Sequence, residues 1–125
     1  MGAEYTGPVR IIARSTLSGF VRHRVERRLQ RIVKEQLDSW FAVVSRAAWK
    51  NPAELKEQFR SASIISAERV VFNIRGNEFR LVVAVDYGHG VVLIIWLGTH
   101  HEYDQTDVAQ VRFERERYAN PSGSK

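Results

Sequence analysis

Residues 69–97 limit the possible folds more than any other part of the chain, because three β-type segments alternate there with two tight turns. The segments are expected over 69–74, 79–87 and 91–97, and the turns over 75–78 and 88–90. Gly and Asn, which occur in these turns, tolerate positive φ angles. Connections this short join antiparallel neighbours. The sequence therefore predicts an antiparallel meander.

The side-chain pattern of the second segment indicates which face of the sheet is covered. Alternate positions on one face are apolar: Phe79, Leu81, Val83, Val85 and Tyr87. Since successive side chains of a strand point to opposite faces, Arg80 and Asp86 belong to the other face, together with Val82 and Ala84. The run Val91 to Leu97 is apolar on both faces, as expected of a central strand.

The N-terminal half of the chain is predicted to be mostly helical. A short strand, Val9 to Ile12, precedes a stretch from about Ser18 to Ala48 in which apolar residues recur every three or four positions. It forms one helix, or two with a break. Its opposite face is basic: Arg22, Arg24, Arg27, Arg28, Arg31 and Lys34. That face is either solvated or binds RNA or an acidic segment of a partner.

A second, shorter helix is predicted over Pro52–Phe59. Asn51 is a plausible N-cap, and Pro52 suits the first helical turn. Residues 61–66 are expected to be a loop. Together these segments predict an α+β fold, with N-terminal helices packed on a small antiparallel sheet. Residues 1–108 are expected to form a single domain, and 109–125 a charged C-terminal tail that is partly disordered and frayed from Asn120 onward.

Composition excludes several classes of protein. The 125 residues include no cysteine, which rules out disulfides and thiolate metal sites. No apolar run is long enough for a membrane-spanning helix, and no secretory signal precedes the first strand, so a cytoplasmic protein is expected. Lys and Arg number 19 against 14 acidic residues, giving a net charge of +5. Because arginine predominates and binds phosphate in pairs of hydrogen bonds, RNA is a plausible partner. The alternative is a solubilising surface charge.

Three ordered segments resemble one family. They are Ala48-Trp49-Lys50-Asn51-Pro52-Ala53-Glu54-Leu55-Lys56, then Val71 to Leu81, then Gly98-Thr99-His100-His101-Glu102-Tyr103-Asp104. In this order and spacing they are similar to HigB-type toxins of the RelE-like superfamily, over residues 9 to about 108. The resemblance implies a ribosome-dependent mRNA endoribonuclease that a DNA-binding, helix-turn-helix antitoxin neutralises.

The residue types in these segments suit RNA cleavage without a metal or other cofactor. Such cleavage needs a base, an acid and cations that stabilise the charged phosphorane. His100, Arg80 and Tyr103 are the catalytic candidates: histidine titrates near neutral pH, arginine clamps phosphate, and tyrosine stacks on a base or donates a hydrogen bond. Asn73, Arg75 and Asn77 are candidates for RNA binding.

Each candidate also has a structural alternative. His100 can be an ordinary surface residue, Tyr103 can cap the core, Asn77 can simply form the turn, and Arg80 can pair with Asp86. A metal site at His100-His101 is disfavoured because the spacing matches no standard pattern. The family commonly has an arginine in the last central strand, where this chain has Ile95. That departure keeps open a protein that binds RNA or the ribosome without cutting it, or a co-repressor partner of the antitoxin.

Overall fold

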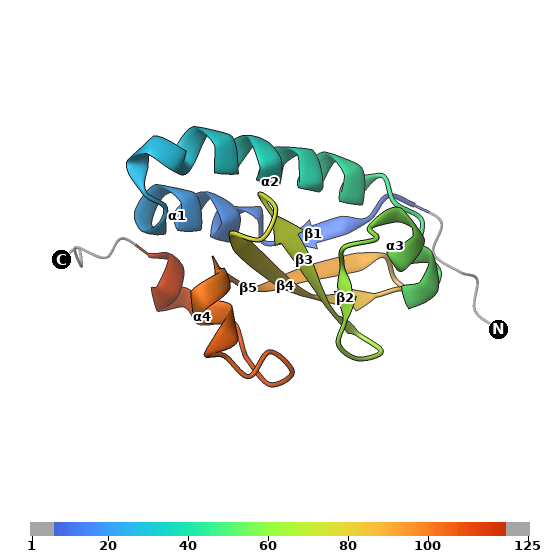
Figure 1. Cartoon of the computed structure of the whole chain (residues 1–125). Helices are drawn as coiled ribbons and strands as arrows, with labels where there is room; N and C mark the ends of the chain where they lie inside the picture. Colours follow the sequence, from blue (N-terminus) through green and yellow to red (C-terminus); the bar gives the residue numbers. More distant parts are fainter. Residues whose placement is uncertain (1–6, 120–125) are drawn as a thin grey trace.

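The computed structural model of the chain describes residues 7–119. A five-stranded sheet in the order β1-β5-β4-β3-β2 forms its centre. Helices α1 and α2 cover one face of the sheet, and the short helix α4 lies on the other side (Figure 1). This arrangement confirms the predicted α+β class.

The predicted meander is present as β3 (Arg69–Ile74), β4 (Phe79–Asp86) and β5 (Val91–Thr99). Both connecting turns use positive φ angles, at Arg75 and Gly76 in the first and at Gly90 in the second. Two further strands extend the meander. The edge strand β2 (Ser63–Ile64) pairs antiparallel with β3 in a region expected to be a loop.

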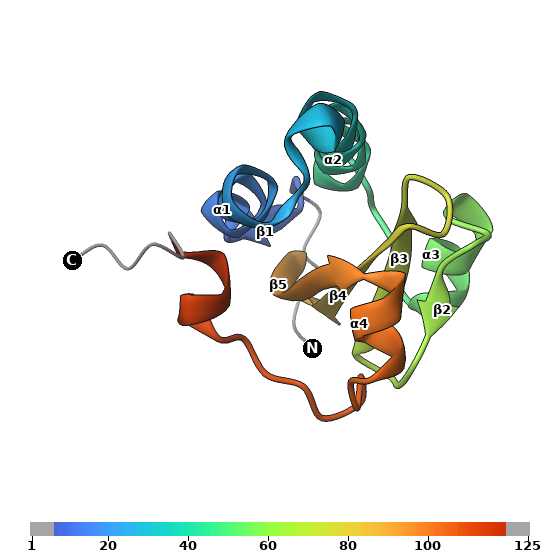
Figure 2. The same cartoon turned by 60° about the vertical axis from the view of Figure 1, so that its left-hand side comes forward.

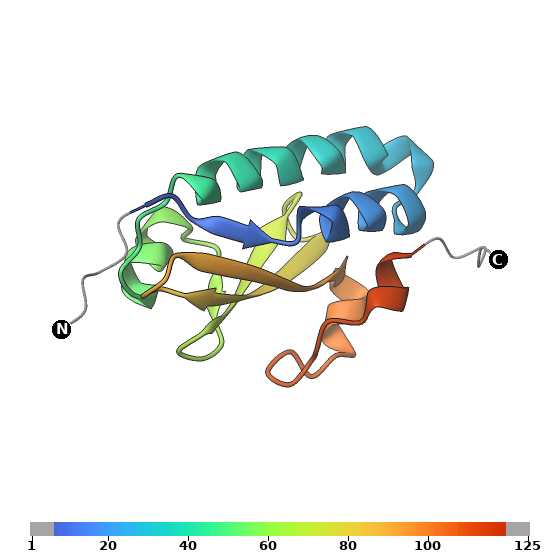
Figure 3. The ribbon, with the colours of Figure 1, turned by 180° about the vertical axis from the view of Figure 1, so that it is seen from behind.

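The sheet is mixed because the N-terminal strand β1 (Arg10–Ile12) runs parallel to β5 (Figure 3). Parallel neighbours need a long crossover connection, and the helical half of the chain separates these two strands in the sequence. The antiparallel sheet expected from the tight turns therefore gains one parallel edge strand, which turn chemistry does not reveal.

Two helices occupy the stretch that was expected to hold one helix or two. They are α1 (Arg14–Arg24) and α2 (Gln30–Ser45), with a short 3₁₀ turn, η1 (Arg27–Leu29), between them. The break begins at Val25, whose backbone is extended and whose carbonyl accepts a hydrogen bond from the Gln30 side chain at 3.0 Å. The two helices lie side by side over the sheet (Figure 2).

Helix α3 (Pro52–Gln58) begins as predicted. The Asn51 side chain accepts a hydrogen bond from the Glu54 amide at 2.9 Å, and Pro52 occupies the first turn. This confirms Asn51 as an N-cap, which satisfies one of the free amide groups at a helix start.

Apolar side chains form two separate clusters, one on each face of the sheet. The larger cluster lies between the sheet and the helices and includes Phe20, Trp40 and Phe72. The smaller one consists of Val71, Val82, Ile95 and Trp96. A β-bulge explains why the adjacent residues Ile95 and Trp96 of β5 both belong to the smaller cluster. At the bulge Val82 pairs with Trp96 while Val83 pairs with Ile94.

The chain after α4 (His100–Asp104) returns across the face that carries the smaller cluster. Arg69 donates hydrogen bonds to the carbonyls of Val108 and Val111, at 2.9 and 2.8 Å. The segment then reaches η2 (Arg115–Tyr118), where the Tyr118 hydroxyl accepts a hydrogen bond from the Leu97 amide at 3.0 Å. Residues 109–119 of the expected charged tail are thus anchored to the domain at Val111, Arg117 and Tyr118, while most of the other side chains in this range are exposed. Residues 120–125 lie outside the described residues.

Candidate functional site

Arg80 projects from β4 on the sheet face opposite the α1–α2 layer, as the strand alternation predicts. It is half-buried, and its guanidinium donates to the backbone carbonyl of Asn77 at 3.0 Å and to the Asn77 side-chain oxygen at 3.5 Å. Asp86, the alternative partner, instead binds His89. The turn residue Asn77 therefore orients Arg80 while leaving its charge without an acidic partner among residues 7–119.

Helix α4 is held at its start by a capping box. The Thr99 hydroxyl accepts from the Glu102 amide at 3.1 Å, and the Glu102 carboxylate accepts from the Thr99 amide at 2.9 Å. This reciprocal pair satisfies two free amide groups. The capping box makes the chain helical directly after β5.

Tyr103 brings α4 into contact with the sheet. Its ring centroid lies 5.6 Å from the Arg80 Cζ and 6.4 Å from the Trp96 ring centroid. A guanidinium within about 6 Å of an aromatic ring makes a cation–π interaction. Tyr103 is half-buried against the smaller cluster, so it both packs on the sheet and borders Arg80.

His100 is exposed at the first position of α4. Its Nε2 lies 3.4 Å from the Asp104 Oδ2 one turn later. Its backbone amide donates to the Glu78 carbonyl at 2.9 Å, which joins α4 to the 75–78 turn. One short helix thus carries both the titratable His100 and the aromatic Tyr103 beside Arg80.

Glu102 anchors this helix to two distant parts of the chain. Its carboxylate accepts from Arg24 of α1 at 2.8 Å and from Arg117 of η2 at 2.9 Å. Burial raises the pKa of Glu102, but hydrogen bonds from the Thr99 amide and the two arginines outweigh it, and the net pKa lies below its ordinary value. The charged carboxylate therefore fastens the end of α1, α4 and η2 together.

Gly98 leaves room for Arg117 to enter this network. A Cβ at this position would come within 2.4 Å of both the Arg117 Nη2 and the Trp96 ring. In that space Arg117 donates to the Leu97 carbonyl at 3.0 Å and lies 4.7 Å from the Trp96 ring centroid. A side chain other than glycine would displace one of these groups.

The structure brings some of the predicted residues together and separates others. Arg80, Asn77 and Tyr103 are in contact, and His100 shares a helix with Tyr103. Asn73 pairs with Arg80 across β3 and β4, and its amide donates to the Ser61 carbonyl at 3.2 Å.

Arg75 makes different contacts. Its guanidinium pairs with Glu78, and its backbone amide donates to the Gln36 side chain of α2 at 2.8 Å. These contacts do not include Arg80 or Tyr103, so Arg75 is connected to His100 through Glu78 and makes no direct contact with Arg80 or Tyr103 within residues 7–119.

Sequence reasoning missed Glu102, Arg117 and Trp96. The sequence did contain a signal for Glu102, because it lies three positions after Thr99, and a Thr and a Glu at this spacing form a capping box. Arg117 had none, since it lies beyond the segments that carry the resemblance.

Ile95, where the family commonly has arginine, is 5% exposed in the smaller cluster. This position therefore contributes apolar packing and no charge.

Metal-binding clusters and membrane-spanning helices are both absent from residues 7–119. No group of three or more His, Asp or Glu side chains within that range is placed to hold a metal ion. None of the helices in that range combines the length and the apolar character that crossing a bilayer requires.

Comparison with protein families gives a match over most of the sheet and α4. The model of the HigB toxin family, described as the RelE-like toxic component of a toxin–antitoxin system, matches residues 33–106. That range is more than half of the chain, and it includes most of α2, the meander and α4. No curated protein matches the sequence.

Proposed function

Since the chain belongs to the HigB toxin family, the RelE-like toxic component of a toxin–antitoxin system, we propose that it is an endoribonuclease that cuts mRNA on the ribosome, in the cytoplasm. The observation that carries this proposal is that the Arg80 guanidinium of β4 lies 5.6 Å from the centroid of the Tyr103 ring. Tyr103 belongs to the short helix that begins with His100. A cation and an aromatic surface thus lie next to each other, and a titratable side chain begins the same short helix.

The proposed reaction uses the 2′-hydroxyl of the RNA itself as the nucleophile. This oxygen attacks the adjacent phosphorus, the bond to the 5′-oxygen of the next nucleotide breaks, and a cyclic phosphate and a free 5′-hydroxyl result. One proton leaves the 2′-hydroxyl and one is delivered to the departing oxygen. Because side chains can transfer both protons and stabilise the phosphorane, this scheme requires no metal or cofactor.

Each candidate residue has a role in this scheme. Arg80 binds the scissile phosphate through charge-assisted hydrogen bonds, and His100 is the acid or the base. Tyr103 stacks on a base of the mRNA or orients it. Asn77 positions Arg80, as its two hydrogen bonds indicate. Asn73 and Arg75 are proposed to contact RNA at the border of the site.

The toxin–antitoxin family implies an antitoxin partner. We propose that this partner is a helix-turn-helix protein that binds DNA and neutralises the toxin. Its reading frame is expected directly beside that of this chain.

A second candidate function is supported by Ile95. With this side chain buried in the smaller cluster, one family arginine is absent from the phosphate-binding side. A protein with fewer cations at the site can bind RNA or the ribosome without cleaving it, or act only as a co-repressor with its antitoxin.

One experiment separates these functions. The full chain is added to programmed ribosomes, with mRNA cleavage and ribosome binding followed in parallel. The proposed activity predicts cleavage of translated mRNA, while the same RNA without ribosomes stays intact. Binding with fully intact mRNA supports the non-cleaving function, and the absence of both leaves only the co-repressor.

A further inference from the structure

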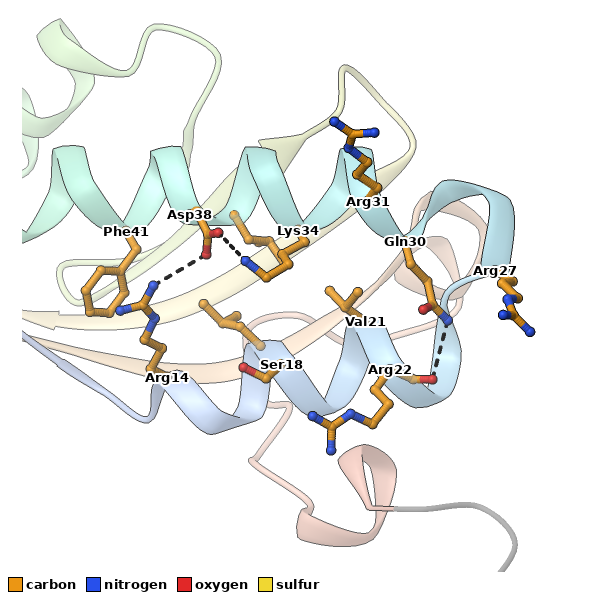
Figure 4. A pocket seen from close by; sticks show the side chains of 12 residues that line it. Arg14, Ser18, Val21, Arg22, Arg27, Gln30, Arg31, Lys34, Asp38 and Phe41 are labelled. Carbon is orange, nitrogen blue, oxygen red and sulfur yellow. Dashed lines mark hydrogen bonds and ion pairs between the residues drawn. The ribbon is translucent and has the colours of Figure 1, made fainter.

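A groove of about 610 Å³ runs between α1 and α2, in the layer that covers the sheet face opposite α4 (Figure 4). Its volume is in the range of sites that enclose a ligand. None of the residues proposed for RNA cleavage lines it. It is therefore a second surface with its own chemistry.

The floor of the groove is apolar. Leu17 and Val21 of α1 and Leu37 of α2 lie at the bottom, and all three are buried. Phe41 closes one end, with the guanidinium of Arg14 4.1 Å from its ring centroid. A partner that uses this floor must therefore present apolar side chains.

The two rims are strongly basic. Five of the lining residues are cationic: Arg14, Arg22, Arg27, Arg31 and Lys34. Asp38 is the one acidic residue in the lining. Arg14 and Lys34 already bind Asp38, at 3.4 and 2.7 Å, and Arg31 binds Glu35 at 3.3 Å. Arg22 and Arg27 form no ion pair with any residue of 7–119, so two guanidinium groups remain available to an acidic partner.

An apolar floor between basic rims fits a particular chemistry. The phosphates of RNA would use the rims but leave the floor unmatched. An amphipathic helix with an apolar stripe and acidic flanks matches both, since such helices bind grooves through apolar residues at positions i, i+3, i+4 and i+7. At about 1.5 Å per residue, the 11 residues of α1 accommodate about three turns.

We infer that the α1–α2 groove binds an acidic amphipathic helix of a partner protein. This inference rests on the proposed partnership with an antitoxin for the source of the helix, but it does not depend on RNA cleavage. Charge complementarity draws the segment to the rims, and burial of its apolar stripe on the floor holds it in place.

The probe for the test is a labelled 14-residue peptide with leucines at helical spacing and glutamates elsewhere. Binding to the full chain is measured by fluorescence anisotropy at low salt. A peptide of the same composition in scrambled order and a 14-nucleotide RNA are the comparison probes. The ordered peptide is expected to bind at least tenfold more tightly than the scrambled one.

Two variants locate the binding surface. Ser18 is exposed and lines the groove, so Ser18→Trp should fill the groove and weaken binding at least tenfold, whereas Ser18→Ala should not. The double charge reversal Arg22→Glu with Arg27→Glu should also weaken binding at least tenfold. The matched reversal of Arg46 and Arg60, two exposed arginines outside the groove, should change binding less than twofold.

Several results would overturn the inference. Equal binding of the scrambled peptide means that charge alone is recognised. Full binding by Ser18→Trp, with its fold verified by circular dichroism, places the peptide elsewhere. Preference for the RNA, lost in the Arg22/Arg27 variant, makes the partner a nucleic acid. mRNA cleavage is assayed separately on the same variants, so failure of the proposed nuclease activity would show in the wild-type chain and leave the peptide result intact.

Discussion

The guanidinium of Arg117 donates a hydrogen bond to the carboxylate of Glu102, with an Nη2–Oε1 distance of 2.9 Å. The same guanidinium also binds the Leu97 carbonyl through two nitrogens. Glu102 caps the helix that carries His100 and Tyr103. A residue outside the range matched by the family therefore holds the proposed catalytic helix against β5.

Replacing Arg117 with alanine should destabilise the protein by about 2 kcal/mol, the typical contribution of hydrogen bonds to charged groups. Its side chain is only 15% exposed, so water compensates little for the loss. Cleavage should fall together with stability because Glu102 of α4 loses one of the two arginines that bind it. Chemical denaturation measures the change.

Arg115→Ala is the matched control for this prediction. Arg115 lies in the same 3₁₀ turn and is exposed, so its loss should change the free energy of unfolding by less than about 0.5 kcal/mol. Equal stabilities of the two variants would show that the Arg117–Glu102 contact contributes nothing.

The pKa of Glu102 predicts how stability responds to acid. Because the folded-state pKa lies below the ordinary value of 4.5, the unfolded chain takes up a proton first as the pH falls. The stabilisation from this carboxylate is therefore fully present above about pH 4.5 and is lost as the pH falls through the lower, folded-state pKa.

Glu102→Gln tests this prediction, since glutamine keeps the capping geometry without the charge. The unfolding free energy of the wild type should exceed that of the variant at pH 7, and the difference should shrink as the pH drops below 4.5. The pKa values of Asp38 and Asp86 are also lowered, chiefly by hydrogen bonds from Lys34 and His89. Both groups titrate in the two proteins and cancel. A difference that stays constant from pH 7 to 3 would contradict the prediction.

Local patterns in the sequence predicted the parts of the fold that depend on neighbouring residues. The turns at Gly76 and Gly90 identified the meander, and Asn51 identified the start of α3. The parallel pairing of β1 with β5 and the bulge opposite Val82 and Val83 depend on contacts between distant segments. No local rule encodes such contacts.

In the candidate site, too, local patterns were predictable from the sequence, and contacts between distant segments were not. Strand alternation predicted that Arg80 points away from Phe79 and Leu81, and the structure confirms this. The contribution of Arg117 could not be predicted, because it depends on the chain returning over Gly98. That return joins residues about 20 positions apart, and the charged composition of 109–119 resembles that of a solvated tail.

Arg80→Ala should abolish most of the cleavage and leave the fold intact. Within residues 7–119 its side chain makes hydrogen bonds to Asn77 alone and a cation–π contact with Tyr103, so little native structure depends on it. Loss of a charge-assisted phosphate contact costs about 1.5–3 kcal/mol, or roughly tenfold to over a hundredfold in rate. Arg80→Lys should retain part of the activity, since it keeps the charge but not the planar fork. If circular dichroism showed that Arg80→Ala is unfolded, Arg80 would instead be a structural residue.

The last prediction separates two adjacent histidines. His100→Ala should reduce single-turnover cleavage on programmed ribosomes by roughly 10²–10⁴-fold if the residue transfers a proton, while ribosome binding is kept. His101→Ala should be nearly silent. Successive helix residues are rotated by about 100°, so the two rings of α4 point in different directions and only one can reach the phosphate at Arg80.

Tyr103→Phe adds a third measurement at the same site. It keeps the ring beside Arg80 and removes the hydroxyl, so a loss of cleavage would assign a hydrogen bond to Tyr103 and retained cleavage would assign stacking. The role of His100 has a sharper criterion. If His101→Ala is the variant that loses cleavage, or if both alanine variants cleave at the wild-type rate, the proton is moved by a group other than His100. The proposed mechanism would then be wrong.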